Sequence, residues 1–330
     1  MATGQLASAA IEQFSLPELE SAAELVHRYV PPTPQYCWPL LARRVGCELW
    51  VKHENHTPLG AFKVRGGIVY VSALHGQQGE AKGLVAATRG NHGQSLAFAA
   101  RLLGLKAVVV VPHGNSEEKN AAMQALGAEL IVQGADFQES LEYAHEFAAE
   151  NDLIPAASFH PLLVKGIASY GLEMFRGMPK PDLVYVPIGL GSGICGVMAA
   201  RDALGLNTAV VGVVSKDAPA YSLSFRKREP VSHAVTTRIA DGMACRKPDE
   251  AALERIWRGV ERIVEVTDDE VEAAMRAYFS DTHNVAEGAG AAALAAAVQE
   301  REHLAGKRVA VVLSGGNVDR ALFARVLSAR

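Results

Sequence analysis

Residues 183–193 have the sequence Leu-Val-Tyr-Val-Pro-Ile-Gly-Leu-Gly-Ser-Gly. The run 183–187 is continuously apolar, as expected of a strand buried on both faces of a parallel sheet. The three glycines in residues 189–193 let the backbone approach a phosphate, which successive N–H groups and the dipole of a following helix would hold. This order of strand, loop and helix predicts an α/β fold with a phosphate site at the carboxyl end of a strand.

Runs of the same kind recur along the chain and alternate with amphipathic or Ala-rich stretches. Further strands are predicted at 48–52, 84–88, 106–111, 128–132, 209–214 and 308–313, and helices at 92–103, 117–126, 136–150, 250–261, 268–281 and 286–302. Thr267 and Glu270 form a capping box at the start of one helix. Such alternation indicates parallel sheets with right-handed crossovers.

Residues 191–196 also match the dinucleotide pattern GxGxxG. That pattern needs an acidic residue roughly 20 positions further on, at the end of the next strand, to bind a ribose. The next strand ends Val213-Val214-Ser215-Lys216, so the acidic partner is missing. A nicotinamide dehydrogenase therefore stays only as a rival hypothesis.

A second loop, Thr88 to Gly93, follows the strand 84–88 and opens a helix. Exposed amides at a helix start suit an anion such as a substrate carboxylate. An N-cap by Asn91, with glycines for a tight turn, explains the segment equally well.

Lys63 follows a Pro/Gly turn and a Phe, at the predicted start of a helix. The positive end of the helix dipole disfavours the charged form of a lysine there and favours the neutral nucleophile that imine formation needs. Taken alone, the position favours an ordinary solvated lysine on a first helical turn. Ser314 follows the last predicted strand and places a hydroxyl at another carboxyl edge, although this segment also fits a simple turn.

The composition limits the function. The formal net charge is −4, apolar residues make up 49% of the chain and charged residues 21%. These values fit a globular protein without a basic surface for nucleic acid or anionic membranes. No apolar run has the length of a membrane span, and the first thirty residues contain one Arg and no Lys, unlike a secretion signal. The four scattered cysteines predict reduced thiols and no zinc, so a cytoplasmic location is expected.

Together and in this order, four segments resemble the serine/threonine dehydratase branch of the fold-type II pyridoxal-phosphate enzymes. They are Ala61-Phe-Lys-Val-Arg-Gly66, Gly90-Asn-His-Gly93, the glycine loop 189–193 and Ser314-Gly-Gly-Asn317. The likeness spans the chain from about Pro31 to Ser328. It implies two open, mostly parallel twisted sheets flanked by helices, like the tryptophan synthase β-subunit, with pyridoxal 5'-phosphate in a cleft between two domains. The expected domains are a large cofactor-binding one, 1–75 and 155–330, and a small mobile one, 82–152, inserted within it.

The resemblance also assigns roles to residues. Lys63 would form the Schiff base and act as the catalytic base, Asn91 would contact the cofactor's 3-oxygen, and Ser314 would contact the pyridine nitrogen. The residues so assigned to the cofactor are Phe62, Lys63, Asn91, Gly189, Leu190, Gly191, Ser192, Gly193, Glu287 and Ser314. Those assigned to the substrate are Thr88, Arg89, Gly90, Asn91 and His92.

The activity implied is that of a pyridoxal-phosphate-dependent ammonia-lyase. It would eliminate water from a β-hydroxy amino acid such as L-threonine or L-serine and release a 2-keto acid and ammonia. Alternatives are the same elimination on threo-3-hydroxyaspartate, phenylserine or a hydroxylated diamino acid, or a non-catalytic phosphate-ligand binder. Relatives are commonly homodimers, and the expected lack of a C-terminal regulatory extension points to a catabolic or specialised role.

The chain departs from its relatives at two places. Racemases of the family have a Ser where this chain has Arg89, which does not ionise in proteins, so racemisation through two bases is not expected. Metal-stimulated relatives have acidic residues where this chain has Val214 and Ala220, so no metal site is expected. Arg89 could bind a second acidic group of a substrate or pair with Glu287, and the pairing is the favoured interpretation.

Overall fold

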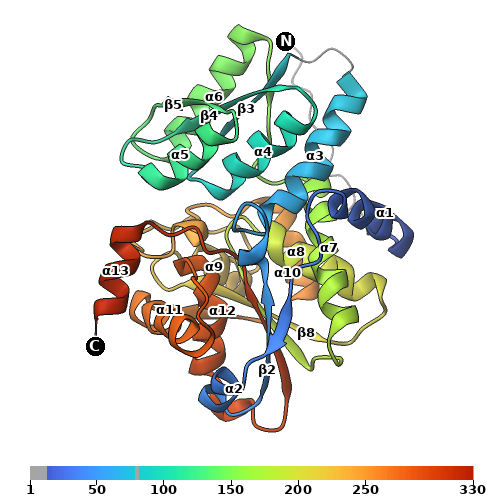
Figure 1. Cartoon of the computed structure of the whole chain (residues 1–330), viewed down its shortest axis with the longest axis vertical. Helices are drawn as coiled ribbons and strands as arrows, with labels where there is room; N and C mark the ends of the chain where they lie inside the picture. The colour runs from blue at the N-terminus through green and yellow to red at the C-terminus, as the bar shows by residue number, and fades with distance from the viewer. Residues whose placement is uncertain (1–12, 79–81, 330) are drawn as a thin grey trace.

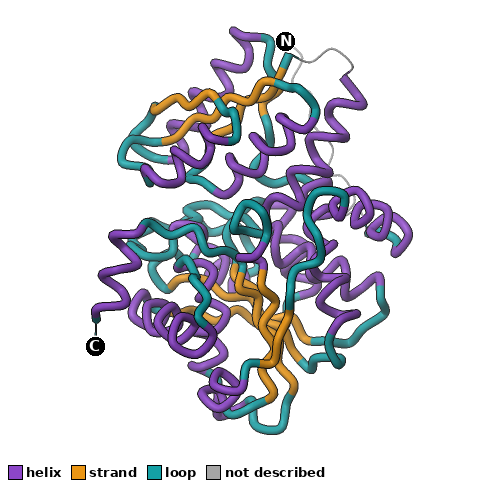
Figure 2. Tube along the Cα trace, viewed as in Figure 1, coloured by secondary structure: helices purple, strands orange, loops and turns teal. Residues whose placement is uncertain are grey.

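In the computed structural model, which describes residues 13–78 and 82–329, the strands form two separate sheets (Figures 1 and 2). The larger sheet has the order β1-β2-β10-β7-β8-β9, in which β1 is antiparallel to β2 and the other pairs are parallel. Its strands are β1 (Gln35–Cys37), β2 (Glu48–His53), β7 (Leu183–Pro187), β8 (Ala209–Ser215), β9 (Arg262–Val266) and β10 (Arg308–Leu313).

The smaller sheet is wholly parallel, with the order β5-β4-β3-β6. Its strands are β3 (Gly83–Ala87), β4 (Lys106–Val111), β5 (Glu129–Val132) and β6 (Ile154–Pro155). In Figure 1 it lies above the larger sheet, and α3 and α4 lie between them.

Helices cover both faces of each sheet. On the larger sheet, α2 (Pro39–Val45), α11 (Asp268–Thr282) and α12 (Gly288–Gln299) pack on one face, and α1 (Leu16–His27), α7 (Pro161–Gly177), α8 (Ser192–Ala203) and α10 (Glu250–Gly259) on the other. On the smaller sheet, α3 (Lys63–Gln78), α4 (Asn91–Leu102) and α5 (Glu117–Ala125) lie on one face and α6 (Phe137–Asn151) on the other. The remaining helices are α9 (Ala220–Lys227), α13 (Arg320–Ser328) and the short η1 (Glu54–His56), η2 (Asp241–Met243) and η3 (Arg301–His303).

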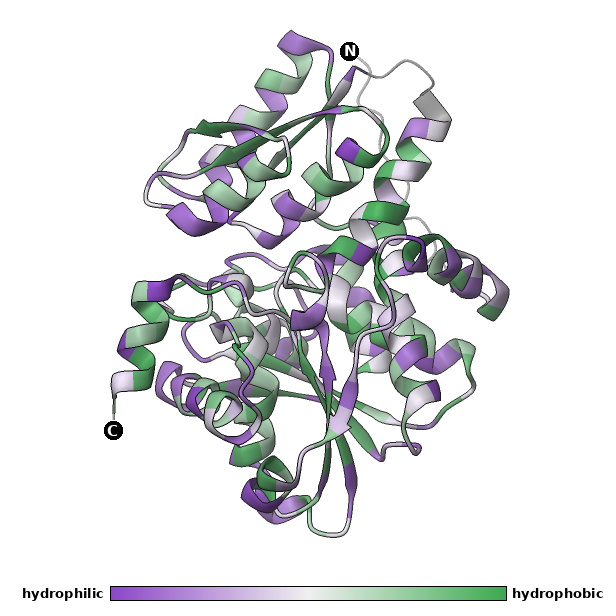
Figure 3. Cartoon of the chain, in the orientation of Figure 1, coloured by the Kyte–Doolittle hydropathy of each residue, from purple (hydrophilic) through white to green (hydrophobic). Residues whose placement is uncertain are grey.

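Burial on both faces explains the apolar strands. Leu183 and Tyr185 of β7 enter one hydrophobic core, while Val184 and Val186 enter the core on the other side. Each strand residue therefore needs an apolar side chain, whichever way it points. The same holds in the smaller sheet, whose strands are strongly hydrophobic in Figure 3.

The predicted fold is confirmed, and all seven predicted strands are present. The capping box of Thr267 and Glu270 opens α11 as predicted. Strands β1, β6 and β9 and helix α7 were not predicted. The domain boundaries stay a prediction; β6 pairs with β3 and so adds residues 154 and 155 to the smaller sheet, and the predicted large-domain residues 1–12 lie outside the described residues.

All four cysteines are free thiols. Within residues 13–78 and 82–329, no helix has the length and apolar character needed to cross a bilayer.

Candidate active site

The predicted site segments meet where the carboxyl ends of strands from both sheets converge. The Lys63 segment is tied to the turn after β10, because the Phe62 amide donates to the Ser314 carbonyl at 3.0 Å and the Gly316 amide donates to the Gly60 carbonyl at 2.8 Å. Thr57 closes the loop before Lys63: its Oγ1 accepts from the Ala61 amide at 3.0 Å and donates to the Ala61 carbonyl at 2.8 Å.

Asn91 joins the second loop to the same place. Its Oδ1 accepts from Asn317 Nδ2 at 2.8 Å, and its Nδ2 donates to Glu287 Oε1 at 2.7 Å. Gly90 is the N-cap of α4, and the Asn91 side chain caps nothing. The capping interpretation of Asn91 is therefore wrong, and this amide instead connects the loops that carry Glu287 and Asn317.

Lys63 is the first residue of α3, as predicted. Its ammonium makes no hydrogen bond or ion pair with any residue that the structure describes, and it lies 5.3 Å from the centre of the Phe62 ring. Burial lowers the pKa of Lys63 to about 8, although the charge of Glu287 acts in the opposite direction. Lys63 is thus an amine that loses its proton readily.

A second lysine, Lys119 of α5, reaches the same place and was missed by the sequence analysis. Its Nζ lies 2.7 Å from Asp241 Oδ2 and 3.2 Å from Glu287 Oε2. Burial would lower the pKa of Lys119, but the two carboxylates outweigh burial and raise it. Lys119 is therefore held as a cation. The ion pair with Glu287 was predicted for Arg89, and that prediction is wrong.

Arg89 itself is exposed and makes no hydrogen bond or ion pair within the described part of the chain. The neighbouring Thr88 is buried, and its Oγ1 accepts from the amides of Gly90 and Gly93 at 3.0 and 3.2 Å. Thr88 therefore shapes the loop, which leaves the Asn91 and His92 amides without a partner among the described residues.

His92 is buried behind this loop, where its Nε2 lies 3.1 Å from the Ala157 carbonyl. Burial, together with the charge of Lys63, lowers the pKa of His92 to about 3. The ring is therefore neutral at pH 7, and its Nε2–H donates to the carbonyl.

The glycine loop after β7 presents a row of free amides. Among the described residues, none accepts a hydrogen bond from the backbone N–H groups of residues 189–193. Gly191 has a φ of +97°, which favours glycine, and a Cβ on Gly189 would lie 2.4 Å from the Gly242 carbonyl. The loop lies against the Lys63 segment, since a Cβ on Gly193 would touch the Phe62 ring at 3.3 Å.

The model of the pyridoxal-phosphate dependent enzyme family matches residues 26–315. The chain belongs to this family. It is 32% identical to the catabolic L-threonine dehydratase of Staphylococcus aureus over 313 residues, 92% of this chain and 89% of the relative. It is also 32% identical to the biosynthetic L-threonine dehydratase of Haemophilus influenzae, where the match covers 89% of this chain but only 58% of the relative. The structure of maize serine racemase superposes with a TM-score of 0.89 at 25% identity, covering 95% of this chain and 97% of the racemase.

The site of the enzyme fits the family's cofactor, pyridoxal phosphate. The free amides of residues 189–193 at the start of α8 suit its phosphate. Ser314 is 5% exposed, yet its hydroxyl makes no hydrogen bond with any described residue, so it can serve the ring nitrogen. Lys63 supplies an unpaired amine. Pyridoxal phosphate is thus the enzyme's cofactor, and the nicotinamide hypothesis is wrong.

Proposed function

We propose that the enzyme eliminates water from a β-hydroxy amino acid such as L-threonine or L-serine, releasing a 2-keto acid and ammonia, with the cofactor attached to Lys63. The observation that carries this proposal is that the two lysines at the site have opposite electrostatic surroundings. Lys63 has no ion-pair partner and a pKa lowered to about 8, whereas Lys119 is fixed between two carboxylates. The relatives named as threonine dehydratases support the same reaction.

The residues divide the work as follows. The amides of residues 189–193 would bind the cofactor phosphate, Ser314 Oγ would contact the ring nitrogen, and the free amides of Asn91 and His92 at the start of α4 would bind the substrate carboxylate. When bound, pyridoxal phosphate supplies an electron sink for the bond broken at the substrate Cα. Lys63 Nζ, once free and neutral, takes the Cα proton as a general base.

Elimination is favoured over racemisation because, among the described residues considered at this site, Lys63 alone is suited to exchange a proton with Cα. A two-base route needs a second group that exchanges a proton on the opposite face of Cα. Lys119 holds its proton between two carboxylates, His92 stays neutral with a pKa of about 3, and Arg89 does not ionise. These protonation states oppose a racemase activity like that of the maize enzyme in this chain.

The test is to reduce the holoenzyme with borohydride, locate the modified peptide by mass spectrometry, and measure keto-acid release from L-threonine and L-serine. We expect the label on Lys63, and we expect Lys63→Ala to abolish both turnover and the visible absorption of the bound cofactor. Lys106→Ala, which removes a half-exposed lysine from the smaller sheet, serves as the control. Turnover near the wild-type rate in Lys63→Ala would refute the proposal.

One observation favours a second candidate, an acidic substrate such as threo-3-hydroxyaspartate. Arg89 is exposed and unpaired within the described part of the chain, beside the amides assigned to the substrate carboxylate. A guanidinium there could bind a second carboxylate. If it does, Arg89→Ala should weaken transition-state binding of hydroxyaspartate, measured from kcat/KM, by about 1.5–3 kcal/mol, the usual contribution of a hydrogen bond to a charged group. The kcat/KM for threonine should not change. An equal effect on both substrates, or none, would exclude this candidate.

A further inference from the structure

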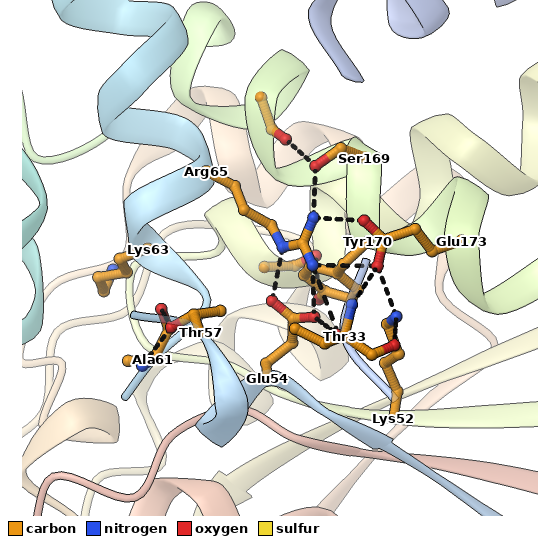
Figure 4. A network of polar contacts seen from close by, with 12 residues as sticks. Thr33, Lys52, Glu54, Thr57, Ala61, Lys63, Arg65, Ser169, Tyr170 and Glu173 are labelled. Carbon is orange, nitrogen blue, oxygen red and sulfur yellow. Dashed lines mark hydrogen bonds and ion pairs between the residues drawn. The ribbon is translucent and has the colours of Figure 1, made fainter. Parts of the chain in front are cut away.

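Arg65, two residues after Lys63, lies at the centre of a buried polar network (Figure 4). Its guanidinium forms two forks. Nε and Nη2 donate to Glu54 at 2.7 and 3.0 Å, and Nη1 and Nη2 donate to Glu173 at 2.6 and 3.0 Å. Nη1 also donates to Ser169 Oγ at 3.1 Å. Arg65 and Glu54 have no exposed side-chain surface, and Glu173 has 8%.

A second cation balances the two carboxylates. Lys52 Nζ lies 2.6 Å from Glu173 Oε2 and donates to the Thr33 carbonyl at 2.8 Å. Two buried cations thus face two buried carboxylates, and both cations donate further hydrogen bonds, to Ser169 and to Thr33. Charge balance alone would not require a guanidinium at position 65, because any cation there would supply it. The planar double fork, however, is specific to arginine.

The network fixes the first turn of α3 against α7. The two helices touch through glycines, because a Cβ on Gly66 would lie 2.8 Å from the Leu163 carbonyl and a Cβ on Gly166 would lie 2.3 Å from the Arg65 carbonyl. Figure 4 shows Lys63 and Arg65 on opposite sides of this turn. A rotation of α3 about its axis that strained the Arg65 forks would therefore move Lys63 in the opposite direction, and a slide of α3 along its axis would carry Lys63 with it.

The same helix α7 also holds the glycine loop. The Tyr170 hydroxyl donates to the Gly193 carbonyl at 3.2 Å, and the Tyr170 ring meets the Phe62 ring edge-on at 6.0 Å between centres. Tyr170 is next to Ser169 and three residues before Glu173. One helix face thus contacts both the turn that carries Lys63 and the loop assigned to the cofactor phosphate.

We propose that Arg65, through Glu54 and Glu173, is a positioning residue that fixes Lys63 relative to the glycine loop 189–193 and so determines how tightly the cofactor is held. This rests on the proposed function, in which Lys63 carries the cofactor. Arg65 acts through the backbone of α3 and through α7, and it touches neither the substrate nor the cofactor.

The test is Arg65→Lys, which keeps the positive charge but cannot form two forks. Its matched control is Arg44→Lys, because Arg44 makes the same kind of fork on Asp281, at 2.9 and 3.1 Å, on the surface. Both purified variants are stripped of cofactor and titrated with pyridoxal phosphate well below their melting temperatures. We expect the Kd of Arg65→Lys to rise at least about tenfold, which corresponds to about 1.4 kcal/mol. Arg44→Lys should stay within about twofold, since exposed ion pairs contribute little.

Kinetics separate positioning from mere stability. Because Arg65 does not touch the substrate, Arg65→Lys should lower kcat roughly 10- to 100-fold, as misplacement of a reacting group by about 1 Å does, and leave KM for the amino acid unchanged. A purely structural role would lower the melting temperature but leave Kd and kcat of the folded protein at wild-type values, and that result would refute the proposal.

A second variant decides the matter if Arg65→Lys does not fold. Tyr170→Phe keeps the ring contact with Phe62 and removes the hydrogen bond to Gly193, so the Kd should rise about 2- to 12-fold, the usual contribution of one hydrogen bond. An unchanged Kd would overturn the proposal. Borohydride labelling of the wild type distinguishes the two failures. A label away from Lys63 refutes the proposed function itself, whereas a label on Lys63 with wild-type affinity in the variants refutes this inference alone.

Discussion

Replacing Lys119 by Met should destabilise the protein in a manner that depends on pH. The change removes the ammonium between Asp241 and Glu287. Asp241 is 40% exposed, so water replaces its partner and the loss there stays below about 1 kcal/mol. Glu287 is 3% exposed and, among the residues that the structure describes, keeps only Asn91 as a side-chain donor, so its carboxylate would lie buried without a counter-ion.

The loss of stability in Lys119→Met is limited by the response of lowest free energy, which is that Glu287 takes up a proton. Burial already raises the pKa of Glu287 and Lys119 opposes that rise, so removing Lys119 raises the pKa further. From the ordinary pKa of 4.5, holding the proton at pH 7 costs at most about 3.4 kcal/mol, and at pH 5 about 0.7 kcal/mol. When a carboxyl has a higher pKa in the folded protein than in the unfolded chain, the folded protein loses stability as the pH rises above the unfolded pKa. The total loss should therefore be about 2–4 kcal/mol at pH 7 and clearly smaller at pH 5.

Urea unfolding with saturating cofactor at pH 5, 6 and 7 measures this difference. Lys106→Met is the control. It removes a half-exposed ion pair with Glu129 that is as short, at 2.7 Å, as the pair of Lys119 with Asp241. This control should lose less than about 1 kcal/mol of unfolding free energy at every pH. A loss in Lys119→Met that is the same at pH 5 and pH 7, or below about 1 kcal/mol at pH 7, would refute the assignment of Lys119 as the counter-ion of Glu287.

Two further predictions concern the cofactor and metals. In the proposed function the Ser314 hydroxyl contacts the ring nitrogen, and Ser314→Asp would place a carboxylate there. Keto-acid release should then slow on the order of tenfold or more and the cofactor spectrum should change. Unchanged rates and spectra would show that Ser314 does not face the nitrogen. A chelator should leave activity and melting temperature unaltered. The side chains of Val214 and Ala220 offer no ligand atoms, and the described residues contain no group of three or more His, Cys, Asp or Glu side chains that could hold an ion. A loss of activity that magnesium restores would contradict this.

Much of the fold could be predicted because most strands are buried on both faces and are therefore continuously apolar. Strand β9 was missed for the opposite reason. Its sequence, Arg-Ile-Val-Glu-Val, lies at an edge of the larger sheet, where only Val264 and Val266 are buried and polar residues are tolerated. Helix α7 was missed because its sequence has Gly166 and Gly171 in its interior, and glycine disfavours a helix.

The candidate site was predictable only where it is local in sequence. The glycine loop and Ser314 each follow a strand directly, and Lys63 is the first residue of the next α-helix after β2, so their placement follows from the topology. Lys119 lies 122 residues from Asp241 and 168 from Glu287, and no spacing rule connects residues so far apart. Arg89 was assigned to Glu287 because no nearby segment of the sequence indicated a pocket for a second acidic group of the substrate. The structure instead brings Asn91, not Arg89, to Glu287.

In the proposed function, the positions of the counter-ions, rather than the positions of the lysines, decide which of the two lysines is reactive. Both Lys63 and Lys119 are surrounded by protein, and burial lowers the pKa of each. The carboxylates of Asp241 and Glu287 reverse the effect at Lys119 alone. With a pKa of about 8, Lys63 has roughly a tenth of its amine neutral at pH 7, about 300 times the fraction of a lysine with the ordinary value of 10.5. A carboxylate brought within ion-pair distance of Lys63 would cancel most of that gain. Glu287 must therefore remain bound to Lys119 and Asn91 for Lys63 to stay reactive.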